Sequence, residues 1–227
     1  MGVKLFLIRH GQTDWNSQGR YQGYQETNLT KVGLKQALLA KKYLSKVKFS
    51  NIYSSPQKRA LDTANILAKK SNCKVIIRED LRELNFGKWE GLKFEELNEK
   101  YHDDYQNWLQ DPFNCPPTEG ENFKSLIERA NKEINNIVNE NPDGSDVAIV
   151  THGGIIVGLL VHWLKIPGSC WRSLIQRQGA INVVVIDKGF PYISSINFTG
   201  HLNRFYDENE DKVIEIYSKL KRYKNGN

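Results

Sequence analysis

The chain has 227 residues, 39% hydrophobic and 26% charged, with a formal net charge of +6, a composition typical of a globular protein with a sizeable core. No apolar run approaches the about 20 residues that span a bilayer, and Arg9 ends the first run too early for a signal peptide, so we expect a cytoplasmic protein with no membrane partner. Dispersed lysines and three cysteines without a CxxC pair argue against a nucleic-acid partner, a zinc site and a disulfide framework.

Short bounded apolar runs alternate with segments of helical periodicity along the chain. The pattern predicts strands over 3–8, 51–54, 75–77 and 147–150, a β-hairpin from 181–186 and 192–198, and helices over 31–46, 121–139, 153–163 and 207–223. This alternation predicts a three-layer α/β/α sandwich with a mostly parallel central sheet. Without a linker or repeat, we expect a single domain over 1–227, with a lid-like helical insertion over about 92–117 and a C-terminal helix.

Two helix starts can be predicted from capping residues. Thr30 is a candidate N-cap for the helix over 31–46, because its hydroxyl can accept a hydrogen bond from the first turn. In "SSPQKRALDTA", Ser55 is a candidate N-cap and Pro56 a candidate first helical residue, where the missing N–H costs nothing. The second helix is therefore expected to begin at Pro56.

The stretches "LFLIRHG" and "VAIVTHGG" have the same organisation, a buried strand that ends in His-Gly. Ligands of parallel α/β sheets bind at the carboxyl ends of the strands. A glycine there lets the backbone turn sharply and approach a ligand. The pattern therefore makes His10 and His152 candidate site residues, against the alternative that both are hydrogen-bonded structural histidines.

A third strand end, before "SSPQKRA", brings Arg59 to the same sheet edge as Arg9 and the two histidines. Such a group of cations repels itself unless an anion lies between them. Guanidinium groups match the oxygens of phosphate. The sequence therefore predicts a phosphate site.

Phosphate chemistry also needs a proton donor, and "LRELNFGKWEG" supplies a candidate. Glu83 follows the third parallel strand in a loop that contains two glycines. The alternative is that Glu83 is an ordinary surface carboxylate, with Glu90, Glu95 and Glu96 as the neighbours to compare.

Six motifs in this order resemble branch 1 of the histidine phosphatase superfamily, the phosphoglycerate-mutase-like proteins. They are "RHGQTDWN" (9–16), "GRYQGYQETNLTKVG" (19–33), "SSPQKRALDTA" (54–64), "LRELNFGKWEG" (81–91), "PTEGENF" (117–123) and "VTHGG" (150–154). "RHG" alone is weakly specific, whereas the ordered set is highly specific.

The resemblance implies a role for each matching residue. His10 corresponds to the nucleophile that becomes phosphohistidine, and Glu83 to the proton donor. The phosphoryl group would be held by Arg9, Asn16, Arg59 and His152, with Gln22 and Gly153 as further residues that bind substrate or phosphate. The family needs no metal and no cofactor for this chemistry. A small phosphorylated metabolite is the expected partner, and a homodimer is left open.

The same pocket serves phosphatases and cofactor-dependent phosphoglycerate mutases, and the residues after Trp108 favour hydrolysis. Mutases of this family have two adjacent arginines there that grip the substrate carboxylate, whereas this chain has Leu109 and Gln110. "GKWEGLKFEELNEKY" instead resembles the small phosphatases, which include broad-specificity phosphatases, α-ribazole phosphatases and metal-independent phosphoserine phosphatases. We therefore expect a metal-independent phosphomonoester hydrolase, with a mutase as the alternative.

Two further hypotheses belong to other classes. A non-catalytic module that binds phosphorylated ligands would lack the nucleophile or the acid, but His10 and Glu83 are both present. A nucleic-acid binder rests on the net charge alone. Two alternatives stay open for His201 and for the aromatic residues of the insertion: they contact the substrate, or they only pack within the protein. The aromatic residues are Phe94, Tyr101, Tyr105, Trp108 and Phe113.

Overall fold

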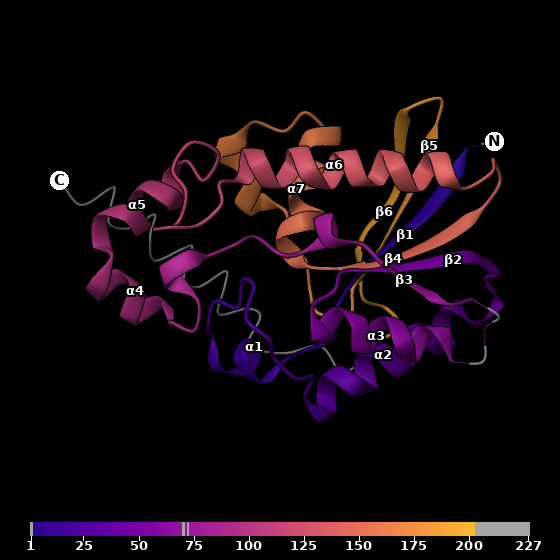
Figure 1. Cartoon of the computed structure of the whole chain (residues 1–227), viewed down its shortest axis with the longest axis horizontal. Helices are drawn as coiled ribbons and strands as arrows, with labels where there is room; N and C mark the ends of the chain where they lie inside the picture. The colour runs from indigo at the N-terminus through magenta and orange to yellow at the C-terminus, as the bar shows by residue number, and fades with distance from the viewer. Residues whose placement is uncertain (1, 70, 72, 203–227) are drawn as a thin grey trace.

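Six strands form one sheet in the computed structural model, which describes residues 2–69, 71 and 73–202 (Figure 1). They are β1 (Val3–Arg9), β2 (Phe49–Ser54), β3 (Val75–Ile77), β4 (Asp146–Thr151), β5 (Ile181–Asp187) and β6 (Phe190–Phe198), in the spatial order β3-β2-β4-β1-β5-β6. The first four strands run parallel, whereas β5 is antiparallel to both β1 and β6. The sheet is therefore mixed, because the predicted hairpin adds its strands beside β1.

Helices cover both faces of this sheet, as the predicted sandwich requires (Figure 1). One layer contains α2 (Lys31–Tyr43) and α3 (Lys58–Ala68), and the other contains α6 (Phe123–Glu140) and α7 (Gly153–Trp163). The side chains of β1 contribute to the cores on both faces of the sheet, because successive side chains of a strand point to opposite faces. Leu5 and Leu7 belong to the core under α6 and α7, and Phe6 and Ile8 to the core under α2 and α3.

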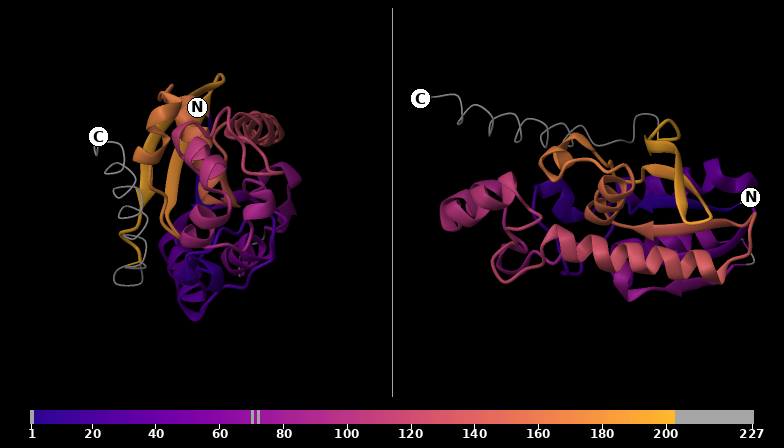
Figure 2. Two further views of the ribbon diagram at one scale, coloured as in Figure 1. Left: turned by 90° about the vertical axis from the view of Figure 1, so that its left-hand side faces the viewer. Right: turned by 90° about the horizontal axis from the view of Figure 1, so that it is seen from above.

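The insertion over 92–117 contains α4 (Phe94–Lys100) and α5 (His102–Gln110). Both helices lie beyond the end of the sheet (Figures 1 and 2). The other helical segments are α1 (Asp14–Gln18) and short 3₁₀ turns at Leu44–Lys46, Glu79–Leu81, Gly87–Trp89 and Gly168–Ser173. No helix in the described part of the chain is long and apolar enough to cross a membrane.

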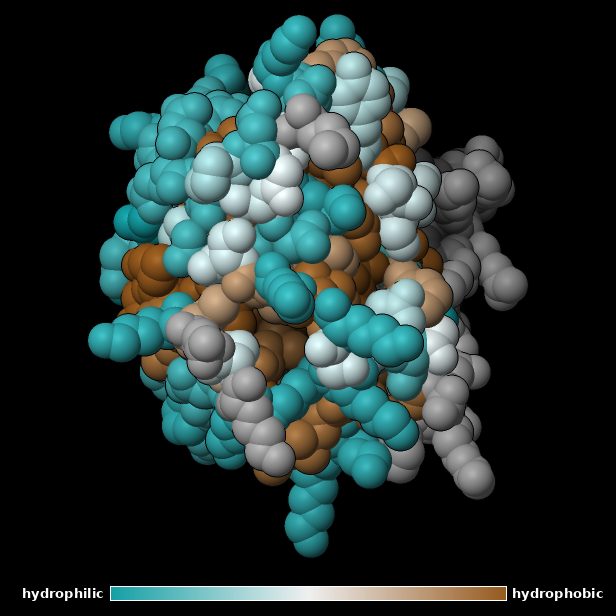
Figure 3. Space-filling model, turned by 90° about the vertical axis from the view of Figure 1, so that its right-hand side faces the viewer, coloured by the Kyte–Doolittle hydropathy of each residue, from teal (hydrophilic) through white to brown (hydrophobic). Residues whose placement is uncertain are grey.

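The opposite end of the molecule presents mixed polar and apolar side chains (Figure 3). Large apolar residues exposed on the described surface include Phe190 of β6, which is 61% exposed. Because such residues contribute little to the core, they provide reference positions for substitutions in the site.

The structure confirms some predicted boundaries and corrects others. Thr30 caps α2 by accepting a hydrogen bond from Gly33 N at 3.0 Å. The predicted start of α3 at Pro56 is wrong, because Gln57 is still extended and the helix begins at Lys58. Helix α1 was not predicted, since its five residues are too few to show a period. The helix expected over 207–223 lies outside the described residues.

Candidate active site

Parallel pairing brings the two His-Gly turns together at one edge of the sheet. Arg9 at the end of β1 is paired in register with Thr151 at the end of β4. The residues that follow, His10 and His152, have ring centroids 5.2 Å apart and an interplanar angle of 61°. The match between the two sequence motifs therefore reflects a real juxtaposition.

The imidazole of His10 is held in one tautomer by its own backbone. Its Nδ1 lies 2.7 Å from the carbonyl oxygen of Gly11, and because a carbonyl only accepts hydrogen bonds, Nδ1 carries the proton. Nε2 then has a free lone pair, and no described residue is hydrogen-bonded to it. His10 lines a cavity of about 500 Å³, so Nε2 is the nitrogen available to a ligand.

Burial and two nearby cations keep this ring neutral. His10 is 2% exposed. Desolvation, followed by the positive charges of Arg59 and Arg9, holds the pKa of His10 well below its ordinary value of 6.5. A neutral imidazole at physiological pH is the form that can act as a nucleophile.

Arg59 is a buried cation that has no carboxylate partner in the described chain. Its side chain donates to the carbonyl oxygens of Gln25 and Gly23, at 2.8 Å each. Its Nε has no hydrogen-bond partner among the described residues. Burial lowers the pKa of Arg59 to about 10, which still leaves it charged at neutral pH. Glu83 and Glu26 act on this charge only from beyond ion-pair distance, and a buried charge without a direct ion-pair partner favours an anionic ligand.

Arg9 reaches the same cavity from the end of β1. Its Nη1 donates to the carbonyl oxygen of Gln176, which fixes the direction of the guanidinium. Gly153, the first residue of α7, lies against it, because a Cβ there would be 3.3 Å from Arg9 Nε. Both residues line the cavity, as predicted.

Asn16 and Gln22 present amide groups to the cavity. The Oδ1 of Asn16 accepts a hydrogen bond from Thr13 N at 3.1 Å. The Oε1 of Gln22 accepts from the hydroxyls of Thr13 and Thr27, at 2.9 and 2.6 Å. Because the oxygens are occupied, the amide N–H groups are the part of each side chain left for a ligand.

His152 lies behind this surface and does not line the cavity. Its side chain is fully buried, and its Nε2 is 2.7 Å from Ser55 Oγ. Nδ1 has no partner among the described residues. Desolvation, followed by the charge of Arg59, holds the pKa of His152 well below 6.5. The Ser55 hydroxyl, expected to cap a helix, instead orients this histidine.

Glu83 lines the cavity beside the start of α7. Its Oε1 accepts a hydrogen bond from Leu84 N at 2.9 Å, and its Oε2 accepts from Gly154 N at 3.2 Å. A Cβ on Gly154 would lie 2.2 Å from Glu83 Oε1, so glycine is required for this contact. The backbone N–H of Glu83 donates to Gln57 Oε1 at 2.9 Å.

The neighbouring carboxylates are arranged differently. Glu90 accepts hydrogen bonds from the backbone N–H groups of Tyr24 and Phe86. Glu96 lies 3.4 Å from Arg20, and the exposed Glu95 lines the cavity. Of these four carboxylates, only Glu83 is hydrogen-bonded to the start of α7, directly after β4.

Several supporting residues were missed by the sequence reasoning. Arg129 of α6 binds three carbonyl oxygens of the loop that contains Glu83, and Glu121 binds Arg129 in turn. Gln57 links this loop to Gly23. The Oε1 of Gln57 accepts the hydrogen bond from Glu83 N, and its Nε2 donates to the carbonyl oxygen of Gly23 at 2.6 Å. Glu121 lies in the quoted motif "PTEGENF", but only the tertiary structure brings it to Arg129.

The open cases from the sequence divide into two groups. Phe94 and Trp108 line the cavity, whereas the other three aromatic residues of the insertion do not. His201 also lies outside the lining residues; its Nε2 is 3.1 Å from the carbonyl oxygen of Gly179. Gly179 N donates to the carbonyl oxygens of Arg9 and His10. His201 therefore supports the site without reaching the cavity.

Among the groups that line this cavity are the neutral imidazole of His10, the guanidinium groups of Arg9 and Arg59, the amides of Asn16 and Gln22 and the carboxylate of Glu83. Together these groups can bind a phosphoryl group, attack phosphorus and transfer a proton. Among the residues that the structure describes, no group of three or more His, Cys, Asp or Glu side chains could hold a metal ion.

Several known proteins are similar to this chain in sequence or in structure. The family model "Histidine phosphatase superfamily (branch 1)" matches residues 5–199. Phosphoserine phosphatase 1 of Hydrogenobacter thermophilus is 32% identical over 206 residues, 91% of this chain and 97% of the relative. The adenosylcobalamin/alpha-ribazole phosphatase of Salmonella typhimurium is 30% identical over 86% of this chain and 96% of the relative. The solved structure of Bacillus stearothermophilus YhfR has a TM-score of 0.84 and 30% identity, covering 88% of this chain and 99% of YhfR.

Proposed function

Because the chain belongs to branch 1 of the histidine phosphatase superfamily, we propose that it hydrolyses small phosphomonoesters through a phosphohistidine formed on His10. The relatives that support this are phosphatases, and this chain is a phosphatase. The observation that carries the residue assignment is the ring of His10, whose Nδ1 is bound to Gly11 and whose Nε2 is left to the cavity.

In the first step, Nε2 of His10 attacks phosphorus and the ester P–O bond breaks. Arg9 and Arg59 hold the non-bridging oxygens, with the amides of Asn16 and Gln22 as further donors. The positive charge that develops on the imidazole is stabilised by the Nδ1–H hydrogen bond to Gly11. Glu83 gives its proton to the leaving oxygen.

In the second step, the Glu83 carboxylate takes a proton from water as the water attacks the phosphohistidine. The N–P bond breaks, inorganic phosphate leaves and His10 is neutral again. We assign His152 to the phosphoryl pocket as well. Its Nε2 is hydrogen-bonded to Ser55 Oγ, so Nδ1 is the nitrogen left for a phosphoryl oxygen, which would have to reach past the present cavity lining to contact it.

The insertion supports hydrolysis rather than mutase activity. At the two positions after Trp108, Leu109 is buried and Gln110 is exposed, and neither lines the cavity. No cation at these positions could retain a phosphorylated acid while the phosphoryl group moves. Phosphoserine and α-ribazole phosphate are candidate substrates by analogy with the named relatives. The cytoplasmic location, the homodimer and the single domain stay predictions.

The test is to quench turnover of a ³²P-labelled substrate in base, which preserves phosphohistidine, with EDTA present. Wild-type protein should carry acid-labile label, and His10→Ala should lose both label and phosphate release. His102→Ala is the control, because His102 is exposed on α5. Undiminished phosphate release by His10→Ala would exclude His10 as the nucleophile.

A further inference from the structure

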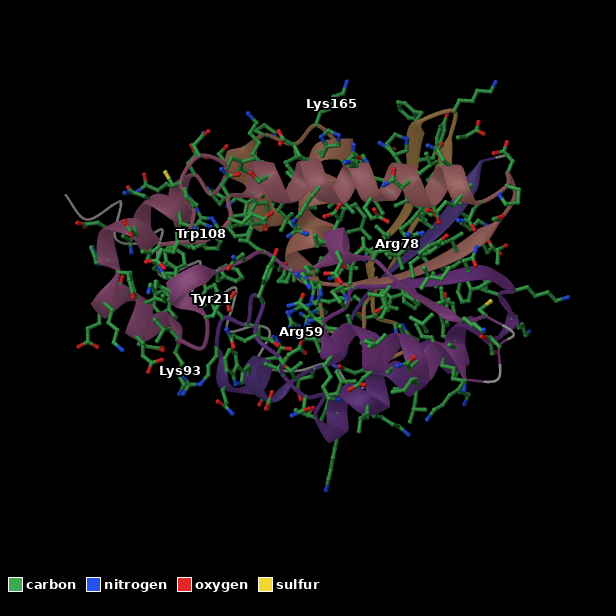
Figure 4. All side chains as sticks on the ribbon, viewed as in Figure 1. Tyr21, Arg59, Arg78, Lys93, Trp108 and Lys165 are labelled. Atoms are coloured by element: carbon green, nitrogen blue, oxygen red, sulfur yellow. The ribbon has the colours of Figure 1, made fainter. Side chains whose placement is uncertain are left out.

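The cavity has two chemically different halves. The half at the strand ends contains the charged and amide groups assigned to the phosphoryl group. The other half is lined by aromatic side chains from distant parts of the chain, namely Tyr21, Phe86, Trp108, Phe123 and Trp171. In Figure 4, Tyr21 and Trp108 lie on the insertion side of Arg59.

These rings form one continuous wall rather than isolated contacts. The ring of Phe86 lies 4.9 Å from Tyr21 and 6.0 Å from Trp108, measured between centroids. Trp108 lies 5.3 Å from Trp171, which lies 5.2 Å from Phe123. Such spacings are those of favourable edge-to-face and tilted ring pairs. The wall therefore has a fixed shape before any ligand binds.

A second set of contacts holds the wall from behind. Trp89 and Tyr105 do not line the cavity, and their rings pack against Trp108 at 5.8 and 6.1 Å. The hydroxyls of Tyr21 and Tyr105 are 2.8 Å apart. The insertion thus fixes the wall and places it next to the phosphoryl half.

The wall begins beside the proton donor. Phe86 follows Glu83 by three residues in the same loop, and Leu84 between them is fully buried and also lines the cavity. The ester oxygen of a bound substrate must lie near Glu83 to receive its proton. The group attached to that oxygen therefore begins in the part of the cavity that the loop with Leu84 and Phe86 also lines.

A serine moiety is poorly matched to this half. The cations Arg20, Lys93 and Arg172 also line the cavity and could pair with its carboxylate. Its ammonium, however, would have to leave water, which is costly unless it finds an anionic partner. The cavity-lining carboxylates are Glu83 and Glu95, and both oxygens of Glu83 already accept backbone hydrogen bonds. Glu95 is exposed.

We propose that the aromatic half is a leaving-group subsite, and that this phosphatase prefers phosphomonoesters whose alcohol carries an aromatic ring over phosphoserine. The proposal rests on the proposed function and names its substrate class. A ring on the substrate would replace water against the wall and pack edge-to-face or offset with Phe86 and Trp108. Hydrolysis of such an ester gives an aromatic alcohol and inorganic phosphate.

The test compares kcat/KM for 2-phenylethyl phosphate, ethyl phosphate and O-phosphoserine, with p-nitrophenyl phosphate as the check for phosphatase activity. The first two esters have alcohols of similar acidity, so their ratio reports ring binding rather than leaving-group chemistry. From the apolar area of one ring, we expect wild type to prefer the phenylethyl ester over ethyl phosphate by roughly 10- to 100-fold. O-phosphoserine should be no better than ethyl phosphate.

Phe86→Ala should lower the phenylethyl-to-ethyl ratio by roughly 3- to 10-fold, and Phe86→Tyr should retain it. Phe86 is the better probe because it is only partly buried, whereas Trp108 is 2% exposed and supports the fold. The ratio is taken within each variant, so a smaller folded fraction cancels. Phe190→Ala is the matched control outside the cavity and should keep the wild-type ratio.

Each result is decisive. A wild-type ratio below about 3, a preference for O-phosphoserine, or a ratio unchanged in Phe86→Ala would overturn the subsite while leaving the phosphatase assignment intact. No hydrolysis of any ester, p-nitrophenyl phosphate included, would overturn the proposed function and the subsite together.

Discussion

Arg129 donates a hydrogen bond from Nη2 to the backbone carbonyl of Glu83 across 2.9 Å. Its Nη1 donates to the carbonyls of Asp80 and Arg82, at 2.8 Å each. Glu121 binds the other side of the same guanidinium at 2.7 and 2.8 Å. One side chain of α6 therefore determines where the loop with the proposed acid lies.

Replacing Arg129 should affect both stability and the function of Glu83. Arg129→Lys keeps the charge but cannot form the planar fork, and it leaves Glu121 and loop carbonyls unsatisfied. We expect the free energy of unfolding to fall by about 2–4 kcal/mol, measured by urea denaturation. Among folded molecules, turnover should become more sensitive to leaving-group acidity, as in a Glu83 variant.

The control for Arg129→Lys is Arg82→Lys, since the guanidinium of Arg82 pairs with the exposed Glu79 and lies over the ring of Tyr24 but binds no loop carbonyl among the described residues, and exposed pairs contribute little. A loss of stability in Arg129→Lys with unchanged sensitivity to the leaving group would mean that Arg129 serves folding alone.

Glu83→Gln should slow esters with poor leaving groups far more than activated ones. An amide cannot give a proton to an alkoxide, so we expect roughly 10²- to 10⁴-fold lower kcat for alkyl phosphates. p-Nitrophenyl phosphate should lose much less in the first step, because its leaving group needs little protonation. Burst and steady-state kinetics of phosphate release separate the two steps.

The matched control for the acid is Glu95→Gln, which removes another cavity-lining carboxylate. Its effect on kcat should stay within about threefold for both ester types, because a solvated charge outside the reacting group contributes little. Equal losses of first-step rate for both ester types in Glu83→Gln would exclude its role as the acid.

Removing the hydroxyl of Ser55 should expose the dependence of the site on His152. In Ser55→Ala, neither nitrogen of this buried imidazole would have a partner in the described chain. We expect a loss of about 1–3 kcal/mol in the free energy of unfolding together with a lower kcat. Ser55→Thr keeps the hydroxyl and should recover most of both; failure of Thr to do better than Ala would contradict this account.

The pH dependence follows from the lowered pKa values of His10 and His152. Because the shift is downward from 6.5, both rings should stay neutral at pH 6.5, where half of an unperturbed histidine is protonated. NMR titration of ¹³C-labelled histidine rings, assigned with His10→Ala, measures this directly. A ring of His10 that titrates at or above 6.5 would contradict the neutral nucleophile.

The same lowered pKa values determine whether the free energy of unfolding rises or falls with pH. Below pH 6.5 the unfolded chain binds protons on histidines that the folded chain keeps neutral, so the free energy of unfolding decreases as pH falls through this window. Above it both states are neutral at these positions and the contribution is constant. Urea denaturation at several pH values checks the slope.

The ordered motifs and the strand-and-helix periodicity were sufficient to predict the sandwich, the parallel strands and the residues that meet at their ends. Arg9 and His10 end a short, bounded apolar run that indicates a buried strand, and glycine follows them because a Cβ on Gly11 would lie 2.4 Å from the carbonyl oxygen of Gly33. Local patterns of this kind depend on neighbours in the sequence, so they can be read without coordinates. The tertiary structure then brought the predicted residues around one cavity, except His152, which lies behind its lining.

Contacts between distant segments were decided only by the tertiary structure. Ser55 looked like a helix cap and instead binds His152, 97 residues away. Arg129 shows no signal in its own helix, because its partners belong to a loop nearly 50 residues earlier and to Glu121. The aromatic wall joins Tyr21, Phe86 and Trp108 from three segments. The chemical groups at the strand ends are therefore encoded in local sequence patterns. The orientation of His152, the position of Glu83 and the shape of the aromatic wall depend instead on packing between segments that are far apart in the sequence.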